Sequence, residues 1–568
     1  MKKYYILILA LVASVACFSS CQDKFDLRDN GTIDMTKVFI DRNRTKGYLN
    51  ACYNYVLGTN LNAGSFSDDA VHSQAITNGT AYDYWYNQGT VASNFGSYNL
   101  DGNPWESLYQ GIRKTNVFLA NIDGATAEMN EAERAGWKAQ ALTLRAYYYL
   151  QIIKRYGKAP LILEDLGTTH DYSTDTKASV ADITKQILAD TDAALTCPNC
   201  EDYAYGYGSG QWGIMNKAVA QAVRAEAVMW AISPLLDDGF SKETAQEVAA
   251  KALKDLLSND YSLWTRTGDG VNAYATYFLT NPNDNRSADK ETIYGGTQVA
   301  VWSNCGVPTV AGISTAGSCP TQELVDAYEM ANGKPAITGY SDAKHLEPIV
   351  NSESGYNEAK PYENRDPRFY ATVWYNGSKR GSTTINTANG APCAINATDI
   401  KYTHTGYYMR KYAADASNRN SNADGFMRTM RLADVYYNFA EVAYQVSGPD
   451  TKVAAAGLSA RDAVNVVRAR AGMPEIPSGL SAADFEKRYR NDRRVEFAME
   501  ADRLFSLRRW KALSTATVVS GMTSTHERFA FDARPTTADK YLLYPLSQTE
   551  ANKILKLTGT SWQNPGWE

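Results

Sequence analysis

Residues 131–156 read EAERAGWKAQALTLRAYYYLQIIKRY, and this stretch decides the fold class. Apolar side chains recur in it at steps of three or four and share one helix face: Ala139, Leu142, Ala146, Tyr149, Leu150 and Ile153. Gly157 follows directly and Pro160 lies just beyond it, which is the usual pattern at the end of a helix. The stretch therefore predicts a long amphipathic helix with one buried face.

The same periodicity recurs along much of the chain. It predicts amphipathic helices at 105–123, 180–195, 214–235, 242–258, 430–446, 459–471, 484–500 and 502–513. Small residues beside large aromatic ones, as in Ala146–Tyr147 and Ala443–Tyr444, let neighbouring helices pack closely. We therefore predict a mainly α fold with a tetratricopeptide-like helix-pair scaffold at roughly 105–260 and 430–513, although no strict repeat period is visible.

Long segments without periodicity separate these helices. Gly, Asn, Ser, Thr and Tyr are frequent at 58–104, 198–213, 265–320 and 334–428. Irregular segments of this length are uncommon in compact domains unless they serve a function. No Pro-rich or charged linker divides the chain, so we expect one large unit over residues 21–568 with loops that form a ligand-binding face.

Composition narrows the class of protein. The chain has 568 residues, 44% of them hydrophobic and 21% charged, with a net charge of -5, which is typical of a folded globular protein. The mild acidity argues against a nucleic-acid partner, and acids interleave with the basic residues of 487–511. The 38 Tyr and 11 Trp, against five His, favour a surface that grips a ligand over acid–base chemistry.

The N-terminus predicts an exported lipoprotein. Lys2 and Lys3 precede an apolar run, Ile6–Phe18, and Ser19-Ser20-Cys21 follows it. The run is too short to span a bilayer and has the layout of a secretory signal. Small residues before a cysteine indicate cleavage after residue 20 and lipidation of Cys21, with membrane attachment by the lipid alone. A plain signal peptide with an incidental cysteine is the alternative.

Searches for catalytic and metal-binding motifs mostly find absences. The chain lacks H-E-x-x-H, G-x-S-x-G and G-x-x-x-x-G-K-[ST], and we expect neither a metal nor a cofactor. Cys197 and Cys200 have the spacing of a redox motif without its βαβ surroundings, so a local disulfide is favoured over free thiols. A pair of carboxylates for glycoside hydrolysis is defined in space and stays open.

Ordered sequence blocks carry a family resemblance. Two examples are Asn364-Arg-Asp-Pro-Arg-Phe369 and Arg493-Arg-x-Glu-Phe-x-x-Glu-x-x-Arg503. The full series is Trp105–Asn116, Ala141–Leu150, Tyr156–Leu161, Pro320–Gly333, Asn364–Phe369, Arg431–Glu441, Val464–Gly472, Arg493–Trp510, Leu542–Pro545 and Gln563–Gly566. Together they resemble the SusD/RagB family of surface glycan-binding lipoproteins of Gram-negative outer membranes.

The resemblance implies an α-rich fold with an irregular ligand-binding region. It implies capture of an oligosaccharide at the cell surface, without catalysis, and its delivery to a SusC-like TonB-dependent outer-membrane barrel over which the lipoprotein sits as a lid. Most of the matching blocks belong to the scaffold. Arg145, Arg365 and Glu496 are accordingly expected to be members of structural ion pairs.

Residue chemistry, and no family motif, nominates the sugar-binding residues. An aromatic ring matches the C–H face of a sugar, and Asp, Asn or Arg reach its hydroxyl groups. The run Tyr82–Tyr86 is the densest aromatic run expected outside a helix, and Trp85, with Tyr84, is the first choice. Further candidates are Asp41, Asn43, Asp68, Arg368, Trp302 and Trp374. Loop packing for the tryptophans, and capping or ion pairing for the polar residues, are the alternatives.

Two other functions remain open from the sequence. The chain could be a lid for a transporter of peptide cargo, or a surface glycosidase. The sequence also leaves the glycan open among α-glucan, fructan and host glycans. The nominated polar groups are mostly acids and amides, which slightly favours a neutral glycan such as fructan.

Overall fold

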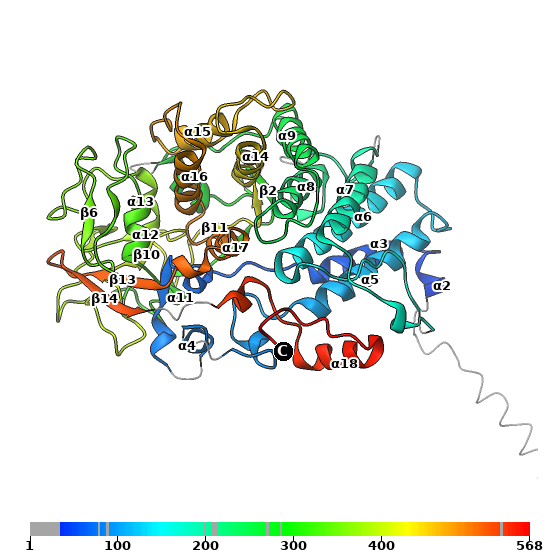
Figure 1. Cartoon of the computed structure of the whole chain (residues 1–568), viewed down its shortest axis with the longest axis horizontal. Coiled ribbons are helices and arrows are strands. Elements are labelled where there is room, and N and C mark those ends of the chain that lie inside the picture. The colour runs from blue at the N-terminus through cyan, green and yellow to red at the C-terminus, as the bar shows by residue number, and fades with distance from the viewer. Residues whose placement is uncertain are drawn as a thin grey trace, which may run out of the picture.

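Long helices form one half of the molecule, and irregular segments with short hairpins form the other (Figure 1). The computed structural model describes residues 35–77, 80–86, 90–167, 169–197, 200–205, 213–268, 272–284, 287–533 and 538–568. The predicted signal peptide, Cys21 and most of the predicted loop 198–213 lie outside these ranges. The mainly α architecture with tetratricopeptide-like helix pairs is confirmed.

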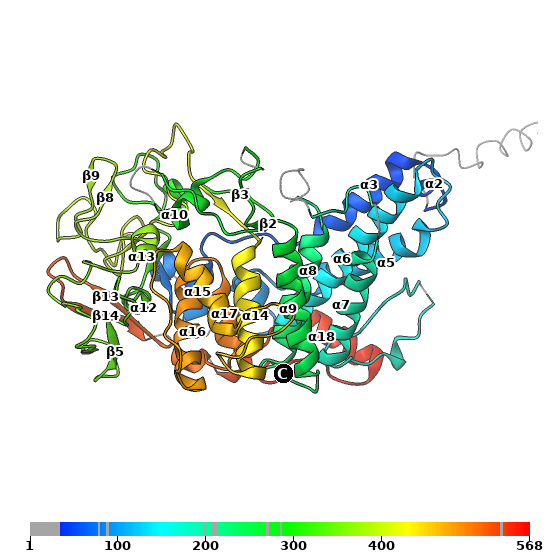
Figure 2. The same ribbon diagram turned by 90° about the horizontal axis from the view of Figure 1, so that it is seen from above.

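The helices lie side by side in a row that is clearest from above (Figure 2). They are α5 (Trp105–Ile122), α6 (Glu131–Tyr156), α7 (Val180–Leu195), α8 (Lys217–Ala231), α9 (Lys242–Ser258), α14 (Leu432–Ser447), α15 (Ala460–Arg470), α16 (Ala482–Glu496) and α17 (Asp502–Arg509). Each of α5 to α9 contacts the next, and α14 continues the row from α9 to α15. Tyrosines predicted to pack the scaffold are buried in it, among them Tyr147, Tyr148 and Tyr437.

Local capping chemistry sets where these helices end. Asn130 accepts a hydrogen bond from the Glu133 amide at the start of α6, and Gly157 ends the helix at a φ of 69°. The predicted helix 484–500 stops early, at Glu496, because Met499 and Ala501 adopt positive φ values of 66° and 72°. This break turns the chain into α17.

Several helices were not predicted from periodicity. They are α2 (Met35–Val38), α3 (Arg42–Cys52), α4 (Ala81–Tyr86), α10 (Ala273–Leu279), α11 (Val301–Asn304), α12 (Gln322–Ala327), α13 (Pro367–Thr372) and α18 (Gln548–Thr558). The expectation that Tyr82–Tyr86 lies outside a helix was wrong, since α4 spans it. Most of these helices are too short for an amphipathic period to be recognised.

Strands in the described residues form two-stranded antiparallel sheets. The pairs are β1 (Ala70–His72) with β4 (Ser318–Pro320), β2 (Thr292–Tyr294) with β12 (Met430–Arg431), β3 (Thr297–Gln298) with β11 (Phe426–Met427), β5 (Ile337–Tyr340) with β6 (Pro348–Val350), β7 (Val373–Trp374) with β10 (Tyr408–Met409), β8 (Lys379–Arg380) with β9 (Thr383–Thr384), and β13 (Val518–Met522) with β14 (Arg528–Ala533). Most pairings join distant segments, so the irregular half is tied together by short long-range contacts.

A buried ion-pair network joins the two halves. Glu496, fully buried at the end of α16, contacts Arg431 at 2.8 Å, Arg368 at 3.1 Å and also Arg470. Burial alone would raise the pKa of Glu496, but these three arginines outweigh it and hold the pKa at about 2. Glu496 is therefore a structural ion-pair member, as expected.

Of the two other residues expected in ion pairs, Arg145 forms one and Arg365 does not. Arg145 pairs with Asp190 at 2.6 Å, in agreement with the expectation. The Arg365 guanidinium instead donates to the backbone carbonyls of Pro361, Val325 and Tyr328, at 2.6–2.7 Å. Arg365 is thus a structural residue whose charge satisfies carbonyl groups where chain segments meet.

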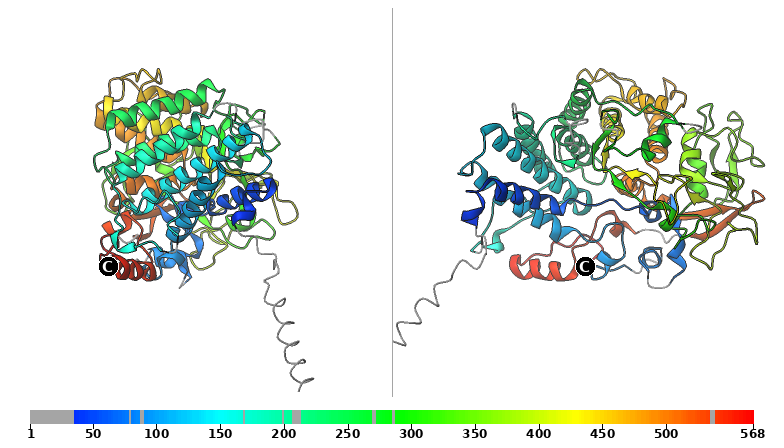
Figure 3. Two further views of the ribbon diagram at one scale, coloured as in Figure 1. Left: turned by 90° about the vertical axis from the view of Figure 1, so that its right-hand side faces the viewer. Right: turned by 180° about the vertical axis from the view of Figure 1, so that it is seen from behind.

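Aromatic rings form a second long-range connection, which we call the aromatic chain. Successive ring centroids are 4.8–5.9 Å apart along Trp85, Tyr541, Trp567, Phe95, Tyr544, Tyr156 and Trp105. The chain leads from α4 through the C-terminal segment to α5. Figure 3 (right) shows that segment, in red, along the lower edge beside N-terminal segments in blue.

Candidate functional site

Asp41 and Asn43 lie far from the other predicted ligand residues. Asp41 accepts a hydrogen bond at 2.8 Å from the Arg44 amide and caps α3, and Asn43 is exposed within that helix. α3 lies at the right of the molecule and α4 at its lower edge, left of centre (Figure 1), so these two residues do not join a site on the irregular half.

Asp68 and Arg368 are committed to buried ion pairs. Both carboxylate oxygens of Asp68 accept hydrogen bonds from Arg503, at 2.7 and 2.8 Å, and Arg494 lies 3.1 Å away. Arg368 is 1% exposed and contacts Asp366, Asp492 and Glu496. Since a ligand would have to break these pairs inside the protein, we remove both residues from the candidate site.

Trp85 and Trp374 are core residues. Trp85 is 7% exposed and packs edge-on against Phe66 and Tyr541. Trp374 is 1% exposed, and β7, which carries it, pairs with β10. Neither ring offers a face to a ligand, so the first choice from the sequence does not hold in the structure.

Tyr84 is better placed. Its ring stacks on Tyr98, with centroids 4.0 Å apart and planes 10° apart, and both rings are half-buried. A stacked pair holds each ring in one orientation, which reduces the entropy lost on binding. The pair therefore provides a fixed aromatic surface at the edge of α4.

Trp302 forms a second aromatic position, on α11. Its ring is half-buried, and its indole N–H is buried without a hydrogen-bond partner. Gly312, at a φ of 90°, packs closely against this ring and against the exposed Arg419: a Cβ there would lie 2.9 Å from Trp302 and 2.8 Å from the Arg419 Cβ, so a side chain does not fit. The Trp302 ring and the aliphatic stem of Arg419 thus both contact Gly312.

Asn62 joins these elements. Its side-chain oxygen accepts hydrogen bonds from the Cys305 thiol at 2.9 Å, next to α11, and from the Ser318 hydroxyl at 3.1 Å, on β4. The same side chain interacts with the Tyr82 hydroxyl of α4. We name the region of α4 and α11, which carries Tyr82, Tyr84, Tyr98, Trp302 and Arg419, the α4–α11 face; both helices lie in the irregular half (Figure 1).

Two buried histidines lie near this face. His72 stacks on Tyr82 with centroids 3.6 Å apart, and its Nε2 has no partner; both ring nitrogens of His404 also lack partners. Burial lowers the pKa of His72 to about 3, helped by His404, and the pKa of His404 to about 4. Both imidazoles are therefore neutral at physiological pH and unsuited to general acid catalysis.

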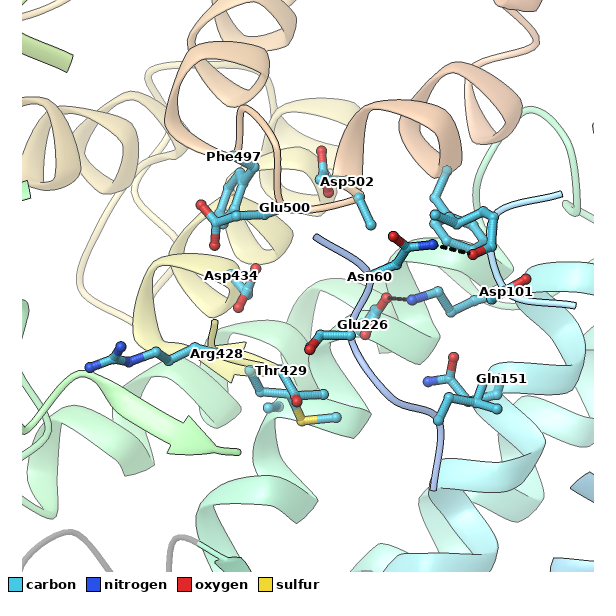
Figure 4. Close-up of a pocket in the computed structure, with 18 of the residues that line it drawn as sticks. Asn60, Asp101, Gln151, Glu226, Arg428, Thr429, Asp434, Phe497, Glu500 and Asp502 are labelled. Atoms are coloured by element: carbon cyan, nitrogen blue, oxygen red, sulfur yellow. Dashed lines mark hydrogen bonds and ion pairs between the residues drawn. The ribbon is translucent and has the colours of Figure 1, made fainter. Parts of the chain in front are cut away.

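A central cavity lies between the helical half and the segment 57–60 (Figure 4). Its volume is about 180 Å³, below the roughly 300 Å³ at which ligand pockets begin. Figure 4 shows Asp434, Glu500, Asp502 and Glu226 directed toward it. Glu500 and Asp502 form ion pairs with Arg431 and Arg493. These carboxylates therefore stabilise the fold and are not free to bind a ligand.

Three further features were checked in the described residues: the state of the cysteines, clusters of metal-ligating side chains, and helices able to span a membrane. Cys197 and Cys200 form the predicted disulfide, and the other described cysteines, Cys52, Cys305, Cys319 and Cys393, are buried free thiols. Over the described ranges, no three His, Cys, Asp or Glu side chains gather as metal ligands. None of the helices in these ranges is long and apolar enough to cross a membrane.

Sequence reasoning missed Tyr98, Arg419 and Asn62. Tyr98 lies in the predicted irregular segment 58–104 and differs from other loop tyrosines only through its stacking on Tyr84. Arg419 is a lone base in the Asn-rich run 418–422, which is a weak signal. No pattern in the sequence marks Asn62 as the residue that joins three elements.

Comparisons with known proteins agree on a family. The model described as "SusD family" matches residues 266–567, more than half of the chain, and one described as "Starch-binding associating with outer membrane" matches residues 33–202. A SusD-like protein P25 of Formosa agariphila is 24% identical over 432 residues, covering 72% of this chain and 70% of that protein.

Solved structures show the same fold. A SusD-like protein from Bacteroides fragilis superimposes with a TM-score of 0.74 at 24% identity, covering 94% of this chain and 98% of that one. A laminarin-binding SusD-like protein gives a TM-score of 0.56 at 20% identity, covering 93% and 99%. The fold and the matched family models together establish that the chain belongs to the SusD family.

Proposed function

We propose that this chain is a cell-surface glycan-binding lipoprotein, anchored at Cys21 in the outer membrane. It captures oligosaccharides at the α4–α11 face and delivers them, uncut, to a SusC-like TonB-dependent transporter. Membership of the SusD family supports this assignment, as do the matching family model described as starch-binding and the similar structure described as laminarin-binding.

The observation that carries the proposal is that α4 and α11, which Asn62 connects, carry half-buried aromatic rings with polar groups beside them. The Tyr84–Tyr98 pair and the Trp302 ring present flat apolar surfaces that match the C–H face of a sugar. Arg419 is exposed beside Trp302 and can donate two hydrogen bonds to ring hydroxyls.

The charge of the face favours a neutral glycan. Arg419 is a single base, whereas an anionic polysaccharide calls for clustered Lys or Arg. Fructans, starch-type α-glucans and laminarin are all neutral polymers and fit this requirement. The neutral state of the nearby His72 and His404 supports binding rather than hydrolysis.

Calorimetry with fructan, α-glucan and β-glucan oligosaccharides tests the proposal. One of these sugars should bind and be recovered intact, and Tyr84→Ala or Trp302→Ala should each weaken its binding by about 1–3 kcal/mol. Tyr48→Ala, at a half-buried ring on α3, is the matched control and should leave the affinity unchanged. Release of shorter products would identify a glycosidase, and copurification with a barrel but no glycan binding would favour a lid for other cargo.

A further inference from the structure

A groove remote from the α4–α11 face lies between α5, the segment 160–175 and α18. Its volume is about 590 Å³, within the range of pockets that hold small molecules. α18 lies along the lower edge of the molecule below α5 (Figure 1). The groove is thus three times as large as the central cavity and opens at the surface.

Aromatic side chains line the groove at different depths. Trp105 and Trp562 are 7% and 8% exposed. Tyr109 is half-buried 4.8 Å from Trp105, and its hydroxyl is held by a 2.8 Å hydrogen bond to the Pro160 carbonyl. Tyr172 is 40% exposed at the rim. Trp105 and Trp562 therefore form the buried floor of the groove, and Tyr109 and Tyr172 are the rings that a ligand could contact.

The rim carries polar groups that keep access to solvent. Arg113 pairs with Asp165 at 3.1 Å with its side chain 69% exposed, and Lys553 lies 3.6 Å from Glu550 with its side chain 64% exposed. Exposed pairs of this kind exchange partners at little cost. The charged lining residues are five acids and two bases: Glu106, Glu164, Asp165, Asp175, Glu550, Arg113 and Lys553. An anionic ligand is therefore disfavoured.

We propose that this groove is a second saccharide-binding site, which takes a short neutral oligosaccharide. Fixed rings beneath a hydroxyl-bonding rim suit a molecule with one apolar and one polar surface. A space of this size admits a few sugar units and is too small to bury the area that a stable protein interface needs. The inference rests on the proposed function, because it assumes that the protein's ligands are glycans.

Two sites on one chain have a measurable consequence. The aromatic chain runs from α4, next to the first site, to Trp105 in the groove. A polymer long enough to reach both sites binds the second one at a high effective concentration. Long chains should therefore bind more tightly than trisaccharides of the same linkage, and the difference should vanish when either site is removed.

The test uses the full chain in detergent, titrated with trisaccharides and polymers of inulin, levan, laminarin and amylose. The groove variants are Tyr172→Ala, at an exposed ring, and Gln110→Trp, which fills the groove from the exposed face of α5. The variant of the first site is Tyr84→Ala with Trp302→Ala. Lys185→Ala, at an exposed position on α7, is the control.

The wild type should bind two trisaccharides. The groove variants should retain one site, weaken the other about tenfold or more and remove the advantage of the polymer. If the protein binds only one trisaccharide, and only the double variant Tyr84→Ala with Trp302→Ala abolishes that binding, the groove is not a saccharide site and the proposed function still stands. If only the groove variants lose sugar binding, the groove is a saccharide site and the α4–α11 face is not. If no sugar on the panel binds, or if the groove variants lose only a protein partner, the second site is wrong.

Discussion

Replacing Glu496 with glutamine removes the charge that Arg431, Arg470 and Arg368 share at the junction of the two halves. The folded pKa of Glu496 is about 2 against an ordinary value of 4.5, and each pKa unit corresponds to about 1.4 kcal/mol, so the carboxylate contributes about 3 kcal/mol. Breaking a buried pair costs a similar 3–5 kcal/mol or so. Typical domains have only about 5–15 kcal/mol of stability, so the loss should be large.

Urea unfolding followed by far-UV circular dichroism measures this loss. At neutral pH, Glu496→Gln should lower the free energy of unfolding by about 3 kcal/mol, whereas Glu247→Gln removes an exposed pair with Lys251 and should change it by less than about 0.5 kcal/mol. Because the folded pKa is depressed, the contribution is present above 4.5 and is lost as the pH falls toward about 2. The variant should therefore lose less stability than wild type over that range. Equal stability of Glu496→Gln and wild type at neutral pH would refute the reasoning.

Three further perturbations test the fold. Trp85→Ala should lower the free energy of unfolding by about 3–5 kcal/mol, because the ring is buried against Phe66 and Tyr541, and Trp85→Phe should lower it by less. An unchanged free energy of unfolding in Trp85→Ala would place the ring outside the core. Mutating Cys197 and Cys200 to serine opens a very short loop, so thermal unfolding should show a loss of about 2 kcal/mol or less, and peptide mapping of wild type should find this pair oxidised. Burial lowers the pKa of His72 to about 3, so wild type should lose stability as the pH falls from about 6.5 toward 3, when the unfolded state takes up the proton first. His72→Phe should flatten that slope in acid-unfolding titrations, and an unchanged slope would contradict the burial.

The features predicted best from the sequence are helix boundaries that nearby residues determine. α6, α7 and α9 begin and end where periodicity and caps placed them, because Asn130, Ser179 and Ser241 each cap the backbone a few residues away. Helices as short as α4 left no period to read. These three helices were therefore predicted residue by residue, the other scaffold helices only to within about four residues at an end, and the irregular half only as a set of segments.

The site was harder to predict because its members are selected by distant contacts. Asp68 has the chemistry of a sugar ligand, but its partner Arg503 lies 435 residues away and takes both of its oxygens. Trp85 and Trp302 look alike in sequence, yet Trp85 is buried against Tyr541 while Trp302 is only half-buried. Residue type alone cannot distinguish a ring that packs from a ring that is presented.

The contacts of the C-terminal segment have a consequence for how the protein is made. Tyr541 bonds to Thr90 at 2.7 Å, Tyr544 to Asp101 at 2.6 Å, and Trp567 packs on Phe95. The loops around α4 therefore lack their native support until the last residues have been synthesised. A nascent chain cannot complete this region early, which is compatible with the export that we propose for the chain. The region around α4 is therefore expected to be among the last to fold, and truncation of the last residues should impair it first.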